Sequence, residues 1–340
     1  MDQSESTDRH REIQESVAIL RDRAARLPAE LAVVLAAEVP ALPLPRGDRT
    51  RFVVTGLGAS EGPARLLVAL LAELGLPAVF APVSAFFGPA PRGDVLVVVS
   101  QQLSPNARLP LRRSAAYRAV ALVTAVEAGE EVTLVLSHPP AREDRILLRV
   151  IGPAAAALVV TRAAIATAAA LGVEPTWASA LPLVPGAATA ATAVGERAPP
   201  DLFERFTALV GSSGTSELLH LARLKLVEGL GLVDPPLWDA CAVVHGPFQA
   251  FYERPTTLLC FAARGDESAA RLLRGLELSV VPERHRLWLH ESTLPGPLAV
   301  FEHDAAVLGL VLGQLSREPR NLIAWPGKGA DAAIYALGAD

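Results

Sequence analysis

The chain has 340 residues, of which 51% are hydrophobic and 20% charged, and its formal net charge is −5 at pH 7. This length predicts one large domain or two medium ones, and the apolar share is ample for a buried core. A negative net charge without a block of basic residues argues against nucleic-acid binding, so we expect no nucleic-acid partner.

The N-terminal segment, 1–45, opens with polar and charged residues, which is the opposite of a secretory signal peptide. We predict a helix over about residues 8–38, ahead of the first domain. Cys241 and Cys260 both lie inside apolar runs, so we predict two buried free thiols and no disulfide framework.

Two stretches of the chain share one pattern, RFVVTGLGASEGPARLLVALLAELGL and RFTALVGSSGTSELLHLARLKLVEGLGL. Each begins with a short β-type run, turns through small residues, and continues as a long helical pattern that ends near a glutamate. Gly56 and Gly211 stand 155 residues apart, and so do Glu73 and Glu228. The matched offset predicts two copies of one α/β domain.

Short apolar runs follow each copy: PAVFAPV, DVLVVVS, RAVALVTA and EVTLVLS after the first, then TTLLCFAA, a helical ESAARLLRGLEL, and HRLWLHES after the second. Continuous Val- and Leu-rich runs are typical of parallel strands buried on both faces. We therefore predict an α/β protein with two doubly wound parallel-sheet domains in tandem. The predicted boundaries are 46–175 for the first domain, 176–195 for a Pro-, Ala- and Gly-rich linker, 196–315 for the second domain, and 316–340 for a C-terminal tail.

Residues 151–173 form an alanine-rich apolar run that is long enough to cross a bilayer. Arg162 at its middle and Pro153 near its start argue against a span, and alanine is only weakly hydrophobic. We predict a buried helix in a soluble cytoplasmic protein that has no membrane partner.

The repeated turn between strand and helix has a chemical use. A strand that ends in small residues and enters a helix leaves several backbone N–H groups unpaired, and the helix dipole makes that spot positive. In the first copy the turn holds Gly58, Ala59 and Ser60. The turn of the second copy holds Ser212, Ser213, Thr215 and Ser216. Such hydroxyls either bind a ligand or merely cap the helices, and a single turn does not decide between the two.

A second polar turn follows the run VLVVV, where Ser100, Gln101, Gln102 and Ser104 come in quick succession. Ligands of an open parallel sheet bind beyond the carboxyl ends of strands, and a doubly wound order would put Ser60 and Ser100 at adjacent strand ends. Two hydroxyl-bearing turns facing one crevice suit a phosphate or several sugar hydroxyls. There is no G-x-x-x-x-G-K-[ST] run, and the dinucleotide fingerprint lacks its third glycine, so nucleotide binding of either kind is disfavoured.

Only two lysines occur in the chain, and Lys225 precedes Glu228 by three residues on one predicted helix face. The two form either an ordinary surface ion pair or part of a site, since the pKa of a lysine falls readily on desolvation. His245 follows in the run VVHGP; a lone histidine there is either a core residue or a catalyst. Together a glutamate, a histidine and a lysine can move a proton between adjacent carbons, open a sugar ring and stabilise an enediolate oxygen.

In their order and spacing, the motifs REIQESVAIL, GLGASEG, VVSQQLSPNA, GSSGTSELLHLARLKLVEG, VVHGP and EPRNL resemble the sugar isomerase (SIS) domain family. The resemblance covers nearly the whole chain and points to the two-domain isomerase half of glucosamine-6-phosphate synthase, aminosugar-phosphate deaminases and deglycases. It implies that Glu228 is the isomerising base, Lys225 its partner on the helix, and His245 the ring-opening histidine, which in the family reaches a neighbouring subunit. It implies a sugar or phosphate site formed by Ser60, Ser100, Gly58, Ala59, Gln101, Gln102 and Ser104. A homodimer is expected, with a small sugar as ligand and no metal or redox cofactor.

The chain also departs from the family pattern. Gln102 and Leu103 stand where the phosphate loop has Ser-Gly, and leucine does not bend at positive φ as glycine does, although Ser104 compensates if the loop is one residue short. Ala85 replaces a usual glutamate. Lys328 comes four residues later than a lysine of the synthase tail, and either reaches the site or is an ordinary surface lysine. No glutamine-hydrolysing segment precedes the first domain, so we expect no synthesis from glutamine.

Three functions remain open. The first is an isomerase or deaminase acting on an amino sugar phosphate or a related ketose, with Glu228, His245 and Lys225 as catalytic residues. The altered loop motivates the other two, which are a non-catalytic sugar-phosphate sensor and an isomerase for a non-phosphorylated sugar derivative.

Overall fold

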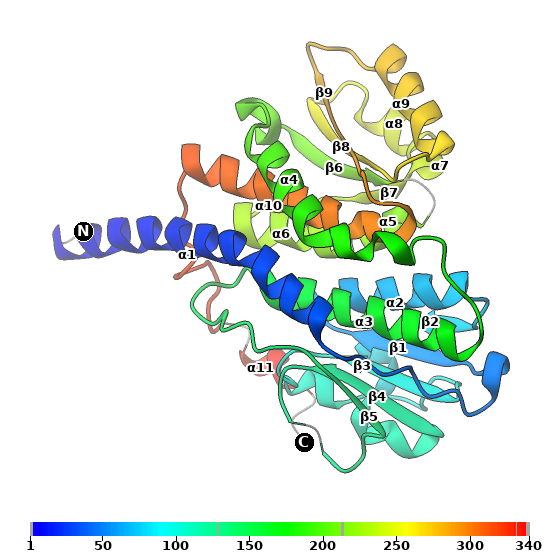
Figure 1. Cartoon of the computed structure of the whole chain (residues 1–340). Coiled ribbons are helices and arrows are strands. Elements are labelled where there is room, and N and C mark those ends of the chain that lie inside the picture. Colours follow the sequence, from blue (N-terminus) through cyan, green and yellow to red (C-terminus); the bar gives the residue numbers. More distant parts are fainter. Residues whose placement is uncertain (1–2, 128, 212–213, 331, 338–340) are drawn as a thin grey trace. The chain divides into compact units, whose positions relative to one another are not determined.

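The computed structural model describes residues 3–127, 129–211, 214–330 and 332–337 (Figure 1). The chain divides into two compact units that are interleaved in sequence. The five-strand unit consists of Ala29–Asp144, Arg149–Ala178 and Ala324–Asp340, and the four-strand unit of Met1–Pro28, Arg145–Leu148 and Ser179–Ile323. The predicted domains are contiguous segments of sequence, whereas each of these units is made of three separate segments. The predicted N-terminal helix is present as α1 (Gln3–Ala36) and contributes residues to both units.

The five-strand unit is built on a parallel sheet with the order β2-β1-β3-β4-β5. Its strands are β1 (Phe52–Gly56), β2 (Ala78–Phe80), β3 (Val95–Val99), β4 (Ala119–Thr124) and β5 (Leu134–Ser137). Every residue of β1, β3 and β4 is buried, which explains their continuous apolar sequences. The order is that of a doubly wound α/β sheet, as predicted.

Helices α2 (Glu61–Glu73) and α3 (Ile151–Ala170) pack against each other beside this sheet (Figure 1). The hydrophobic cluster of the unit joins Val53, Leu96 and Val98 of the strands to Phe86 and Leu111. The latter two belong to short 3-10 helices. The 3-10 helices of the unit are η1 (Gly47–Arg49), η2 (Gly58–Ser60), η3 (Val83–Phe86), η4 (Asn106–Arg108) and η5 (Leu111–Ala116), and α11 (Ala332–Tyr335) lies in its tail.

The four-strand unit has a parallel sheet with the order β7-β6-β8-β9. Its strands are β6 (Phe206–Gly211), β7 (Leu237–Asp239), β8 (Thr256–Ala262) and β9 (His285–Glu291). Both sheets therefore follow the same order of second, first, third and fourth strand, which agrees with the predicted repeat. Strand β7 was not predicted, because a three-residue, half-buried strand carries no alternating or continuous apolar pattern.

Two groups of helices accompany the second sheet (Figure 1). Val243, Phe251 and Leu276 bring α7, α8 and α9 into the core beside β6 and β8, while α10 packs against α4 and α6. The helices are α4 (Val184–Glu196), α5 (Thr215–Leu218), α6 (His220–Leu230), α7 (Ala240–Val243), α8 (Pro247–Phe251), α9 (Glu267–Ser279) and α10 (Ala299–Arg317), with 3-10 helices η6 (Ala178–Leu183), η7 (Pro200–Phe203) and η8 (Gly296–Leu298).

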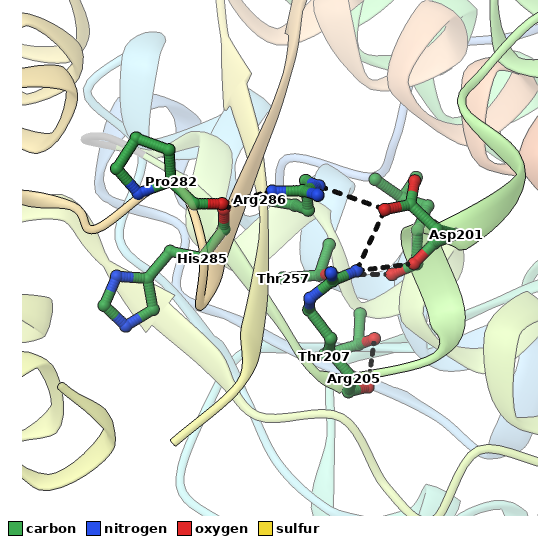
Figure 2. Close-up of polar contacts among 8 residues, drawn as sticks. Asp201, Arg205, Thr207, Thr257, Pro282, His285 and Arg286 are labelled. Atoms are coloured by element: carbon green, nitrogen blue, oxygen red, sulfur yellow. Dashed lines mark hydrogen bonds and ion pairs between the residues drawn. The ribbon is translucent and has the colours of Figure 1, made fainter. Parts of the chain in front are cut away.

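An ion-pair network holds the amino ends of the second sheet together (Figure 2). The Asp201 carboxylate, in η7, accepts hydrogen bonds from Arg286 Nε at 3.0 Å and from Arg205 Nη1 at 3.1 Å. The pKa of Asp201 lies below its ordinary value, chiefly through the hydrogen bond from Arg286. Thr257 Oγ1 donates to the Leu202 carbonyl at 2.6 Å. These residues flank the starts of β6, β8 and β9, so the network lies at the edge opposite to the ligand-binding edge of such sheets.

The segment predicted as a linker, 176–195, is largely helical and contains most of η6 and α4. Its alanines favour helix, and its small residues allow close packing on α10. A Cβ atom on Gly309 of α10 would overlap the Thr192 carbonyl oxygen of α4, and one on Gly195 would overlap the Ala306 carbonyl oxygen. The two helices therefore meet backbone to backbone, which only glycine permits.

Replacing Gly309 by alanine is expected to destabilise the protein by roughly 1–3 kcal/mol, because the added methyl group meets backbone atoms that cannot rotate away. Urea denaturation measures the change as a lower transition midpoint. Gly186→Ala is the matched control: Gly186 is an exposed residue of α4 with open space around its Cβ position, so this variant should be neutral or slightly more stable. Equal effects of the two substitutions would contradict the close packing.

Three helical segments of the described chain are long and apolar enough to cross a membrane: Ile151–Ala170, Ala178–Glu196 and Gly296–Arg317. In the first and third, 83% and 100% of the apolar window is buried inside the protein, against 28% in the second. The apolar run predicted as a buried helix, 151–173, is thus α3, and burial accounts for its composition.

Candidate functional site

The turn after β1 has the geometry expected of a ligand-binding turn. Gly56 must be glycine, because a Cβ atom there would overlap the Ser60 carbonyl, and Gly58 has a φ of +57°. Ala59 follows in η2, and Ser60 stands at the N-cap of α2, buried, with no side-chain hydrogen bond to the helix. The simple capping role considered for Ser60 is therefore not seen, and its hydroxyl is not used by the helix end.

The turn after β3 is closed by its own serine. Ser100 is buried, and its Oγ accepts a hydrogen bond from Leu103 N at 3.1 Å. Leu103 has a φ of +49°, so the expectation that leucine would not bend there as glycine does is wrong. The Ser100 hydroxyl and a hydrogen bond from Arg108 Nε to the Leu103 carbonyl hold this left-handed conformation, which costs a non-glycine residue roughly 1–2 kcal/mol.

The sheet order brings these two turns together. β1 and β3 are neighbours, and their last residues, Gly56 and Val99, are register partners. Ser60 and Ser100 therefore follow adjacent strand ends, as the doubly wound prediction requires. Three more residues of this turn were predicted to contact the ligand. The Gln101 side chain packs against Gly152 at the start of α3. Gln102 is exposed, and Ser104 is half-buried.

The corresponding turn of the second copy is described only in part. Ser212 and Ser213 lie outside the described residues. Thr215 is buried at the start of α5, and Ser216 is half-buried beside it. Gly211 ends β6 as Gly56 ends β1, and a Cβ atom there would lie 2.8 Å from Ser216 N, so both copies need glycine at the same point.

Lys225 is not a surface residue. Its side chain is buried in α6, and Nζ donates to Asp304 Oδ1 of α10 at 2.5 Å. The surface placement considered from the spacing with Glu228 is therefore wrong, and the ion pair of Lys225 with Asp304 joins residues 79 apart in sequence. Burial raises the pKa of Asp304, and Lys225 counteracts that rise. Glu228 lies one turn further along α6 and is half-buried.

Asp304 belongs to a buried polar run at the start of α10. The Glu302 carboxylate accepts hydrogen bonds from the backbone of Thr293 at 2.6 Å and of Leu294 at 3.1 Å, and from the Ser292 hydroxyl. His303 Nδ1 lies 3.0 Å from His290 Nδ1, so one imidazole donates to the other. Burial, aided by the neighbouring His290, lowers the pKa of His303 well below its usual value, which keeps it neutral. Each of the three adjacent polar residues has at least one partner, although His303 Nε2 is buried without one among the described residues.

His245 is exposed at the start of the α7–α8 connection and lines a cavity of about 500 Å³. Cys241 lines the same cavity and is exposed, so the prediction of two buried thiols is wrong for this residue. The backbone N–H of Cys241 donates to Asp239, the last residue of β7 and the N-cap of α7. Cys260, in contrast, is buried in β8, and burial raises its pKa to about 12.

The remaining predicted residue, Lys328, is an exposed residue of the C-terminal tail in the five-strand unit. Its Nζ lies 4.7 Å from the centre of the Trp325 ring, a cation–π contact. Within the described ranges, no group of three or more histidine, cysteine, aspartate or glutamate residues is placed to hold a metal ion.

A second cavity, of about 350 Å³, opens at the carboxyl ends of β3, β4 and β5. Its walls include Gln101 and Gln102, which were predicted, and also His138, Arg142 and Arg149, which were not. No local pattern marks these three residues as cavity residues; only Arg142 lies in a charged run, AREDR, which begins four residues after the end of β5.

No family model matches the sequence, and no curated protein does either. Solved structures do match. The C-terminal domain of glucosamine-fructose-6-phosphate aminotransferase from Francisella tularensis has a TM-score of 0.72 at 12% identity, covering 89% of this chain and 97% of that chain. Glucosamine-6-phosphate deaminase from Thermotoga maritima has a TM-score of 0.68 at 18% identity, with 89% and 96% covered. Tagatose-6-phosphate ketose/aldose isomerase from Escherichia coli has a TM-score of 0.64 at 14% identity, with 92% and 93% covered.

The chain thus has the fold of the SIS-type phosphosugar isomerases. The resemblance to the isomerase half of glucosamine-6-phosphate synthase and to the deaminases is confirmed at the level of the fold. At such low identities the likeness concerns the fold alone, and the chemistry of this chain is argued from its own residues.

Proposed function

We propose that the protein is a sugar-phosphate isomerase or aminosugar-phosphate deaminase that acts by proton transfer on an amino sugar phosphate or a related ketose derivative. The observation that carries the proposal is the pair of turns after β1 and β3, which follow adjacent strands and offer the Ser60 hydroxyl without a capping partner. Proteins with this fold include phosphosugar isomerases and a deaminase, which supports the same reading.

In this proposal Glu228 moves the proton between adjacent carbons, and His245 opens the sugar ring. Glutamate suits the first step because its carboxylate accepts and returns a proton without leaving its place. His245 suits the second because its side chain is exposed and an imidazole can both donate and accept a proton. Lys225 donates a hydrogen bond to Asp304, and its positive charge lies in α6 one turn before Glu228, where it would stabilise the enediolate oxygen.

Two alternatives are kept, a non-catalytic sugar-phosphate sensor and an isomerase for a sugar without phosphate. The second is favoured by one observation: the Leu103 N–H already donates to Ser100 Oγ, which leaves one backbone donor fewer for phosphate in this turn. The expected homodimer and the cytoplasmic location are parts of the proposal as well, and light scattering and cell fractionation test them.

The proposal is tested with the wild-type protein and a panel of sugars. Glucosamine 6-phosphate, fructose 6-phosphate and tagatose 6-phosphate are each incubated in D2O beside their non-phosphorylated forms. Proton NMR follows exchange at the carbon next to the carbonyl, and an ammonia assay follows deamination. We expect exchange or ammonia release with a phosphorylated sugar. Binding without exchange would favour the sensor, and exchange only with the phosphate-free sugars would favour the third function.

A further inference from the structure

The cavity of about 350 Å³ at the carboxyl edge of the first sheet is rich in polar groups that the fold itself does not use. It follows three adjacent strands, β3, β4 and β5, so it occupies the edge where parallel α/β sheets bind ligands. Its walls include His138, Arg142, Glu143, Asp144 and Arg149.

Two guanidinium groups line this cavity without a counter-ion. Arg142 is exposed and Arg149 half-buried, and neither has a hydrogen-bond acceptor or ion-pair partner among the described residues. Partial burial of an unpaired cation is unfavourable, so Arg149 in particular is a group that an anion would stabilise. Arginine offers a planar fork of donors that matches phosphate and carboxylate oxygens.

The carboxylates of the same wall do not cancel these charges. Glu143 is buried, and its two oxygens accept hydrogen bonds from Val150 N at 2.8 Å, Ile151 N at 3.0 Å and Gly152 N at 2.9 Å. The Glu143 carboxylate therefore caps the start of α3 and occupies these three backbone N–H groups, so they cannot bind an anionic ligand. Asp144 is exposed, so its charge is screened by water.

The backbone at Arg142 adds a second argument. Its φ is +46°, in the left-handed region where glycine or asparagine would cost less. A long charged side chain in such a conformation is typical of a site where the side chain has a use that offsets the strain.

His138 supplies a further polar group in the same wall. The imidazole is buried and its Nδ1 bonds to the Pro139 carbonyl at 3.1 Å, so Nδ1 carries the proton. Nε2 is buried and has no partner among the described residues. Burial also lowers the pKa of His138, so the unpaired nitrogen is a neutral hydrogen-bond acceptor. The two arginines of this wall fit a ligand that carries an anion.

We propose that this cavity binds the anionic group of the protein's ligand, a phosphate or a carboxylate, through Arg142 and Arg149. The inference rests on the proposed function only in taking the anion to be part of a sugar derivative. It assigns anion recognition to the run after β5, next to the turn after β3 in which the Leu103 N–H already donates to Ser100 Oγ.

The test titrates the full-length protein with two probes, inorganic phosphate and gluconate. Binding is followed by 31P NMR for phosphate and by ligand-observed proton NMR for gluconate. Arg149→Gln and Arg142→Gln should each weaken binding by on the order of tenfold, and the double variant should abolish it. Arg92→Gln is the matched control, because Arg92 is an exposed arginine before β3, at the other edge of the same sheet, and also lacks a partner in the described chain; it should bind as the wild type does. The probe that binds more tightly identifies phosphate or carboxylate as the source.

Two results would overturn the inference: equal binding by the wild type and the double variant, or no binding of either probe by the wild type. Failure of the proposed function looks different. Arginine-dependent anion binding without exchange or ammonia release on any sugar would leave the site standing and remove the enzyme. Conversely, sugar-phosphate turnover with an unchanged KM in Arg149→Gln would keep the enzyme and remove the site.

Discussion

The variant Lys225→Met is expected to lower the free energy of unfolding by about 3–5 kcal/mol at pH 7, because it leaves the Asp304 carboxylate buried without its counter-ion. Lys225 and Asp304 are only 2% and 4% exposed, so water cannot replace the lost partner. Methionine keeps most of the volume and the apolar contacts of lysine, and the loss therefore reports the charge and not a cavity. Urea denaturation followed by circular dichroism measures the change.

The size of this loss should depend on pH. Burial raises the pKa of Asp304 above its ordinary value of 3.8, and Lys225 opposes that rise; without the lysine the pKa rises further. A carboxyl group whose folded-state pKa exceeds its unfolded value destabilises the native state increasingly as pH rises above the unfolded value, and has no such effect where both states are protonated. The variant should therefore approach wild-type stability as pH falls toward 4.

The control is a double substitution. Adding Asp304→Leu to Lys225→Met removes the uncompensated charge and should restore most of the lost stability, since a buried ion pair is commonly worth no more than an apolar pair of similar size. A single variant within about 1 kcal/mol of wild type at pH 7, or a double variant as unstable as the single one, would show that this pair does not hold α6 to α10.

The second large effect concerns activity. Glu228→Gln should reduce turnover of the sugar phosphate identified by the panel by at least about 10²-fold, since glutamine has nearly the same shape but cannot take up a proton. Ligand affinity and the denaturation midpoint should stay close to wild type, because Glu228 is half-buried and glutamine keeps an acceptor and a similar volume. Deuterium exchange at the carbon next to the carbonyl reports the step directly.

Glu73→Gln serves as the matched control for that experiment. Glu73 occupies the position equivalent to Glu228 in the first copy of the repeat, and its carboxylate accepts a hydrogen bond from Trp177 Nε1 at 2.6 Å, which a glutamine oxygen can also accept. This variant should keep full turnover. Exchange retained by Glu228→Gln, or lost equally in both variants, would rule out Glu228 as the base.

Local patterns were enough to predict much of the architecture. The Val-rich strands β3 and β4 are buried on both faces, so their sequences alone predict a parallel sheet, whichever strands lie beside them. Gly56 and Gly211 each end the first strand of a sheet, and at both a Cβ atom would meet the following turn, which is why one pattern recurs after 155 residues. The predictions failed where the pattern is short or ambiguous, as in β7 and in the Ala-rich α4.

The candidate site could be predicted only in part. Ser60 and Ser100 follow strands that are neighbours in the sheet, as a doubly wound order requires. Arg142 and Arg149 carry no local signal of their own, because an arginine that lines a cavity and one on an open surface look the same in sequence. The bend at Leu103 was misjudged for a related reason: the bonds that hold it come from Ser100 and Arg108, and propensity alone does not include them.

The amino-acid sequence by itself determined the α/β class, the repeated strand–turn–helix unit and the polar turns that follow β1 and β3, because each depends on residues close together in the chain. Only the tertiary structure decided that Lys225 faces Asp304 of α10, that Cys241 is exposed, and that two arginines without an ion-pair partner in the described ranges line a cavity at the sheet edge. The physical reason is that burial and charge pairing depend on which distant segments meet, and periodicity along the chain does not record that.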